Sequence, residues 1–152
     1  MTEDIKETPA SIYEGSLKKL EEDTKIDQAR KPEEIEAAVR GILNRAVEFL
    51  TPRKLLKRMY FADDAGTIVM RESAKDKATQ CCTAGAIMAG NGFDYGFDYK
   101  RATRAVEEAL SDEQKSGMVC FSVMAWSDSP STTKEMALEV LKKAAAEYKY
   151  TG

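Results

Sequence analysis

Apolar residues recur every three or four positions along several stretches of the chain, which is the spacing of one buried helix face. The clearest stretch spans residues 32–50. The same spacing predicts helices over residues 99–110 and 133–148. Small side chains predict a further helix over residues 74–89, suited to the centre of a bundle.

Aromatic and β-branched residues flank a turn signal at residues 63–66 (Asp-Asp-Ala-Gly), which predicts one small β-hairpin near residues 59–70. A short basic helix is expected just before it, over residues 53–58. The apolar run 118–126 fits a buried helix or a buried strand, and we expect a helix because Met and Ala favour it. The fold predicted is mainly α, a compact helical domain of about five or six helices with one hairpin.

The N-terminal residues 1–31 differ from the rest in charge. Residues 1–34 carry six basic and ten acidic side chains. Thr8-Pro9 is a fair helix start, and a thin apolar stripe follows at Ile12, Leu17 and Leu20. We expect either an acidic arm or a docked helix here, followed by a single helical domain over residues 32–152.

The chain of 152 residues contains no histidine, which excludes Ser-His-Asp and Cys-His catalysis and His-ligated zinc. Its net charge of −3 gives no global attraction to nucleic acid or to anionic membranes. The three cysteines include the neighbours Cys81 and Cys82, so we expect reduced thiols and a cytoplasmic location. No apolar run approaches the length of a membrane span, and the acidic N-terminus does not resemble a signal peptide.

The sequence Gly-Phe-Asp-Tyr occurs twice in succession over residues 92–99. Four aromatic side chains on a glycine-hinged loop are typical of a partner-binding surface, although alternate rings could instead fill the core. Basic residues follow the loop directly. The predicted partner-binding residues are Phe93, Tyr95, Phe97, Tyr99, Lys100, Arg101 and Arg104.

A second basic cluster suits single-stranded nucleic acid, because aromatic residues follow it. Its members are Arg53, Lys54, Lys57 and Arg58. The opposing interpretation is a solvated helix face on an acidic chain. The carboxylates at residues 63–64 and the pair Asp94 and Asp98 are better explained as turn and helix caps than as metal ligands. We expect no metal site and no cofactor.

Two segments occur together in a distinctive order: Cys-Thr-Ala-Gly-Ala-Ile at residues 82–87 and Trp-Ser-Asp at residues 126–128, followed by Thr132-x-x-Glu135-Met136. This order resembles an uncharacterised family of small bacterial and phage proteins that pairs Cys-x-x-Gly-Ala with Trp-Asn-Asp and a Thr-x-x-Glu-Val helix start. The resemblance would cover roughly residues 35–147. It implies a fold and a bacterial or phage setting, but no reaction.

The cysteines on a small-residue helix are better explained as core residues than as nucleophiles. With no histidine and no substitute catalytic set, we expect a binding protein rather than an enzyme, while carboxylate- or metal-based chemistry stays open. The first hypothesis is a small soluble protein that binds a macromolecular partner, as an inhibitor of a host system or an accessory part of an assembly. The alternative is a small-ligand or nucleotide binder with a pocket formed by Cys82, Trp126 and Asp128.

Overall fold

The computed structural model describes residues 9–116 and 122–151, and the chain divides into two compact units, residues 1–31 and 32–152. The first unit contains helix α1 (Pro9–Gln28), in which no residue is buried. Its large apolar side chains are all exposed: Ile12, Tyr13, Leu17, Leu20 and Ile26. The predicted apolar stripe is therefore present on a helix.

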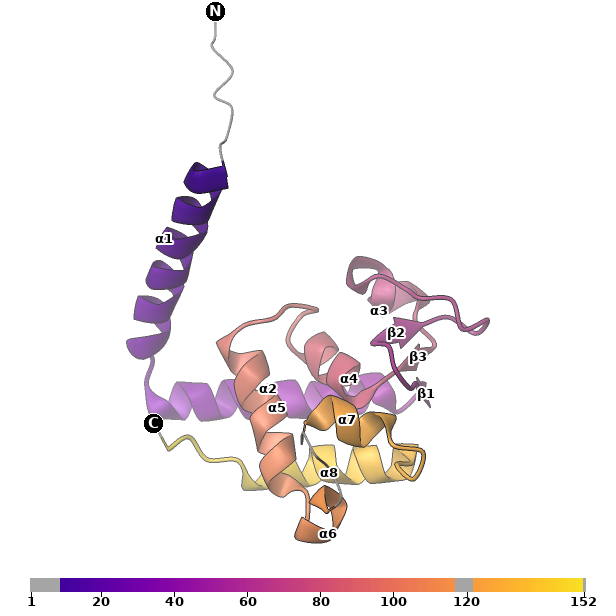
Figure 1. Ribbon diagram of the computed structural model, residues 1–152. Helices are drawn as coiled ribbons and strands as arrows, with labels where there is room; N and C mark the ends of the chain where they lie inside the picture. Colours follow the sequence, from indigo (N-terminus) through magenta and orange to yellow (C-terminus); the bar gives the residue numbers. More distant parts are fainter. Residues whose placement is uncertain (1–8, 117–121, 152) are drawn as a thin grey trace, which may run out of the picture. The chain divides into compact units, whose positions relative to one another are not determined.

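Within its described residues, the second unit consists of seven α-helices, a short 3₁₀ helix and a small sheet. The helices are α2 (Pro32–Leu50), η1 (Arg71–Ser73), α3 (Ala74–Lys77), α4 (Thr83–Gly90), α5 (Phe97–Ala109), α6 (Asp112–Lys115), α7 (Val123–Asp128) and α8 (Lys134–Glu147). Helix α2 is central, because it packs against α4, α5 and α8 (Figure 1). The prediction of a mainly α fold is confirmed. None of the described helices is both long and apolar enough to cross a membrane.

The sheet has three short strands. They are β1 (Lys54–Leu55), β2 (Phe61–Ala62) and β3 (Gln80–Cys81), in the order β1-β3-β2. Strand β3 pairs parallel with β1 and antiparallel with β2. The predicted turn is present, with the Gly66 N–H donating to the Asp63 carbonyl, but a single bridge from Ala62 to Ile68 joins the second arm. The main partner of the hairpin's first arm is therefore the distant β3.

Two predicted helices are wrong. Residues 74–89 are not one helix, because α3 ends at Lys77 and the chain extends through β3 before α4 begins. Residues 53–58 form β1 and a bend, with Arg58 at a φ of 68°. In both places backbone groups pair across the sheet, as when the Leu56 N–H donates to the Cys81 carbonyl.

Of the apolar run 118–126, residues 118–121 lie outside the described residues, and the remainder enters α7.

Helix α4 approaches its neighbours closely because it carries glycine at two contacts. A Cβ on Gly85 would lie 2.5 Å from the Tyr60 carbonyl oxygen, and a Cβ on Gly90 would overlap the Ile42 carbonyl of α2. Gly85 therefore allows α4 to lie directly against the chain at Tyr60. Seven of the eight residues of α4 are buried, with only Ala89 half-buried, so this helix lies within the core.

Side chains cap the starts of several described helices. Ser111 and Gln114 form the capping box of α6. The predicted cap Thr132 is wrong by one residue, because Thr133 accepts the Met136 N–H at the start of α8. The Ser73 side chain makes no capping bond.

Candidate functional site

The aromatic loop has one ring packed on the core and another exposed to solvent. Phe93 is half-buried and meets the Phe49 ring edge-on, with centroids 5.7 Å apart. Tyr95 is 48% exposed, and its ring contacts that of Tyr99 edge-on at 5.4 Å. Phe97 is half-buried at the start of α5. Phe93 therefore anchors the loop to the core, while Tyr95 is presented to solvent.

An open groove of about 460 Å³ lies beside Tyr95, between the hairpin, η1, α4 and α7. Its apolar and aromatic lining residues are Met59, Tyr60, Phe61, Ile68, Val69, Met70, Met88, Tyr95 and Met124, and its charged ones are Arg58, Arg71 and Glu72. We call it the methionine groove. Ile68, Met70 and Met124 expose 63%, 67% and 42% of their surface. Apolar side chains gathered around one hollow are typical of a binding surface, unlike single exposed ones.

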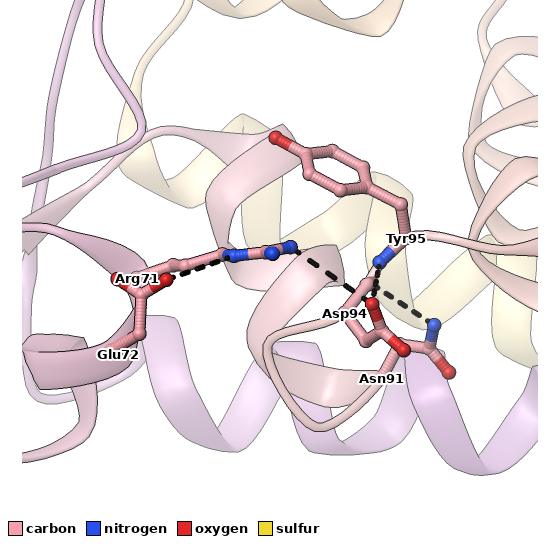
Figure 2. A network of polar contacts seen from close by, with 5 residues as sticks. All are labelled: Arg71, Glu72, Asn91, Asp94 and Tyr95. Atoms are coloured by element: carbon pink, nitrogen blue, oxygen red, sulfur yellow. Dashed lines mark hydrogen bonds and ion pairs between the residues drawn. The ribbon is translucent and has the colours of Figure 1, made fainter. Parts of the chain in front are cut away.

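Arg71 joins the two sides of this groove. Figure 2 shows its side chain reaching from η1 toward the aromatic loop. Its guanidinium lies 3.4 Å from Glu72 and 3.9 Å from Asp94, with the Tyr95 ring centroid 5.3 Å away. The Asn91 amide donates to the Asp94 carbonyl oxygen, and the Asp94 carboxylate accepts the Tyr95 N–H (Figure 2). These contacts place the Arg71 guanidinium beside the Tyr95 ring.

The Tyr60 hydroxyl is an uncharged polar group in the lining of the groove, and Tyr99 lies close to it. The Tyr60 hydroxyl donates to Met124 Sδ at 3.5 Å. Burial, and next the Tyr95 hydroxyl, raise the pKa of Tyr60. Burial is also the main reason why the pKa of Tyr99 is raised. The hydroxyls of Tyr60 and Tyr99 therefore keep their protons at neutral pH and can act as donors.

Arg53, a member of the predicted nucleic-acid surface, is committed to the fold. Its guanidinium donates to the carbonyl oxygens of Phe49 at 2.7 Å and Ala78 at 2.8 Å. The same group lies 3.6 Å from the centroid of the Phe49 ring. Lys54, in contrast, is exposed.

Lys57 is committed in the same way, because its ammonium closes the turn after α7. It donates to three carbonyl oxygens, those of Ser127 (2.5 Å), Ser129 (2.9 Å) and Thr132 (2.8 Å). Burial lowers the pKa of Lys57, while Asp128 opposes the shift. Asp128 also accepts the backbone N–H of Arg58 at 2.8 Å, and the Arg58 side chain is exposed. Only Lys54 and Arg58 of this cluster therefore present charge to solvent.

The basic residues after the aromatic loop lie apart from the methionine groove. Arg101 and Arg104 line a separate hollow of about 300 Å³, beside residues 148–151. Arg101 pairs with Asp98 at 3.0 Å. The two hollows share no lining residue. The structure thus assigns Tyr95 and the two arginines, which the sequence placed in one surface, to different hollows.

Cys82 is the N-cap of α4, where its Sγ accepts the Gly85 N–H at 3.2 Å. Burial raises the pKa of this thiol to about 11. Burial likewise raises the pKa of Cys81 to about 12. Both thiols are protonated at neutral pH, so neither has the thiolate character of a nucleophile.

The structure brings the two distinctive sequence segments together. The Thr83 hydroxyl lies 2.8 Å from that of Ser127, which also accepts the Thr83 N–H at 3.1 Å. The Asp128 carboxylate is close enough to Cys82 to add to the increase in its pKa. Cys82 and Trp126 are buried. The residues of the alternative ligand pocket are therefore neighbours, but two of the three are packed in the core.

A family model matches residues 35–147, that of a family of unknown function, DUF6197. The chain belongs to this family. No curated protein and no solved structure matches the chain. The prediction of membership in an uncharacterised family is confirmed.

The DUF6197 match contains every residue that lines the methionine groove, together with the segments 82–87 and 126–128, whereas α1 lies outside it. The groove is thus a feature of the DUF6197 region of this chain. Sequence reasoning named Tyr95 as a partner-binding residue, but it did not indicate the methionines or Arg71 of the groove. One signal was available: Ile68 and Met70 are two residues apart, so an extended second arm directs both toward one face.

Proposed function

We propose that this protein binds an apolar segment of a partner protein in the methionine groove. The observation that carries the proposal is the set of exposed apolar side chains around the hollow, including Ile68, Met70, Tyr95 and Met124. Burying them against a partner removes apolar surface from water, which is the main driving force of association. Methionine side chains are flexible and polarisable, so they adapt to the shape of a partner segment.

The charges at the groove favour a segment that carries carboxylates. Arg58 is exposed, and within the described parts of the chain no carboxylate forms an ion pair with its guanidinium. The 3.9 Å pair of Arg71 with the exposed Asp94 is loose, and exposed pairs contribute little. Both cations can therefore meet acidic residues at the two flanks of an apolar segment.

A small apolar ligand is the second candidate for the same groove. Its volume of about 460 Å³ lies in the range of ligand pockets, which combine apolar walls with a few polar groups. The Tyr60 hydroxyl supplies such a group. In this alternative the ligand binds in the methionine groove, and not in the predicted pocket at Cys82, Trp126 and Asp128.

The wider setting of the function stays a prediction. We propose a non-enzymatic interaction protein of bacterial or phage origin that acts in the cytoplasm, as an inhibitor of a host system or as an accessory part of an assembly. The support for a non-enzymatic role is the absence of histidine together with protonated thiols at Cys81 and Cys82. The exposed apolar side chains of α1 are the alternative contact surface for the same partner.

Affinity capture of a partner, followed by titration of the purified pair, tests the groove against α1. The groove variant carries Met70→Glu and Met124→Glu, and the matched control carries Leu17→Glu and Leu20→Glu. All four side chains are exposed, so both variants are expected to melt within a few degrees of the wild type. The groove variant should weaken binding by about tenfold or more, and the control should not. If only the control variant loses affinity for the partner, the partner binds α1 and the proposal is overturned.

A further inference from the structure

Methionine is concentrated in the groove. Five methionines lie in the described parts of the chain, and four of them line the groove: Met59, Met70, Met88 and Met124. The fifth, Met136, is half-buried on α8. Met70 and Met124 expose 67% and 42% of their surface, whereas Met88 exposes 1%. Thioethers oxidise when an oxidant can reach the sulfur, so two of the four are accessible and one is protected.

The chemistry of a peroxide at these sulfurs is simple. A sulfur lone pair attacks one peroxide oxygen, the O–O bond breaks, and the thioether becomes a sulfoxide while water leaves. A flexible apolar side chain is thereby replaced by a polar one, which disrupts methionine-rich interfaces. Methionine sulfoxide reductases reverse the change.

Met124 has a neighbour that favours the oxidised form. The Tyr60 hydroxyl already donates to Met124 Sδ at 3.5 Å. A thioether sulfur is a weak acceptor. The sulfoxide oxygen at the same place is a much better one, so the existing donor would hold the oxidised side chain.

We propose that Met70 and Met124 form a reversible oxidation site, at which hydrogen peroxide or a related peroxide closes the groove to apolar partners. The inference rests on the proposed function, because it concerns the regulation of the same groove. It assigns a role to four of the five methionines in the described residues: Met70 and Met124 react, Met88 is protected, and Met136 is the reference outside the groove.

The test treats the full chain with hydrogen peroxide and follows each methionine by peptide mapping. Binding of the apolar probe anilinonaphthalene sulfonate is measured before oxidation, after it, and after treatment with both methionine sulfoxide reductases. We expect conversion of Met70 and Met124 before Met88 and Met136. Probe affinity should fall about tenfold and recover on reduction.

Variants separate the contributions. In Met70→Leu with Met124→Leu, the ratio of probe affinities before and after peroxide should be near one, whatever the starting affinity, and in Met136→Leu it should equal the wild-type ratio. In Tyr60→Phe, oxidation should lower the melting temperature by about 2–4 °C more than it does in the wild type.

The outcomes also separate this inference from the proposed function. Unchanged probe affinity after Met70 and Met124 have been converted overturns the oxidation site and leaves the groove as a binding surface. Oxidation of Met88 and Met136 as fast as that of Met70 and Met124 likewise overturns the oxidation site and leaves the groove as a binding surface. Probe binding that Met124→Glu fails to weaken shows that the groove does not take apolar ligands, and overturns both.

Discussion

The hydroxyl oxygen of Thr83 lies 2.8 Å from that of Ser127, and neither residue exposes any surface to solvent. This contact joins the start of α4 to α7, and it is strengthened by the Thr83 N–H, which donates to the Ser127 hydroxyl. The two distinctive segments of the sequence are thus held together by buried polar groups that have only each other as partners among the contacts described.

Ser127→Ala should destabilise the second unit by about 1 to 3 kcal/mol, because it removes the acceptor of the buried Thr83 N–H and the hydrogen-bond partner of the Thr83 hydroxyl. Urea unfolding measures the change. Ser131→Ala is the matched control, since Ser131 is exposed and its hydroxyl contacts that of Ser129. An equal loss in both variants would show that the buried pair has no special importance.

Lys57→Met should also destabilise the fold, although it removes an ordinary-looking surface charge. The variant keeps an apolar stem of similar length but leaves three carbonyl oxygens without their common donor, which should cost about 2 to 3 kcal/mol. Lys54→Met, at an exposed position, should change the free energy of unfolding by less than about 0.5 kcal/mol. The measurement is chemical denaturation of both variants. A similar loss of unfolding free energy in the two variants would show that Lys57 does not stabilise the fold, and would leave it a member of the predicted nucleic-acid surface.

The sequence predicted those parts of the fold that depend on local pattern. Helix α2 was predicted with its bounds because its apolar residues repeat regularly over five turns. Strand β3 was not, because Gln80 and Cys81 look helical locally and are extended only through pairing with β1 and β2. The basic residues were misjudged for a similar reason: the partners of Arg53 and Lys57 are carbonyl oxygens that only the folded chain brings near them.

The candidate site was predicted only at Tyr95. Its other walls come from the hairpin, η1, α4 and α7, which are far apart in the sequence, so no local spacing reveals the groove. Sequence reasoning also combined Tyr95 with Arg101 and Arg104 because they are close along the chain. Helix α5 separates them, since its turns carry the arginines toward residues 148–151.

The stability of the fold should fall as the pH rises from about 9 to 11. In the unfolded chain Cys82 ionises near its ordinary pKa of 9.0, whereas burial raises its pKa to about 11 in the folded protein. The unfolded state therefore binds fewer protons in this interval, and the stabilisation present below pH 9 is lost by about 2 kcal/mol. Cys82→Ser keeps an acceptor for the Gly85 N–H but does not titrate, so urea unfolding at several pH values should give it a flatter profile. If the unfolding free energy of the wild type and of Cys82→Ser fell in parallel with pH, the loss could not be assigned to Cys82.

Alanine in place of glycine should have opposite effects in α4 and α1. At Gly85 the added Cβ would lie 2.5 Å from the Tyr60 carbonyl oxygen, so the backbone must shift, at a cost of about 3 kcal/mol. At Gly15 the Cβ meets nothing within 4 Å, and the helix gains about 1 kcal/mol of propensity. Circular dichroism should show more helix for Gly15→Ala and earlier urea unfolding for Gly85→Ala. Equal behaviour of the two variants would mean that Gly85 of α4 is not packed against the Tyr60 carbonyl.

The two aromatic residues Phe93 and Tyr95 should separate folding from binding. Phe93 is half-buried and its ring contacts those of Phe49 and Phe61 at centroid distances of 5.7 and 5.9 Å, so Phe93→Ala should cost about 2 kcal/mol of unfolding free energy. Tyr95 is 48% exposed, and Tyr95→Ala should change stability by less than about 0.5 kcal/mol while weakening binding in the groove. Urea unfolding and probe titration, applied to both variants, measure the two effects. A large loss of stability in Tyr95→Ala would make this ring a structural plug as well, and would remove the aromatic loop from the binding surface.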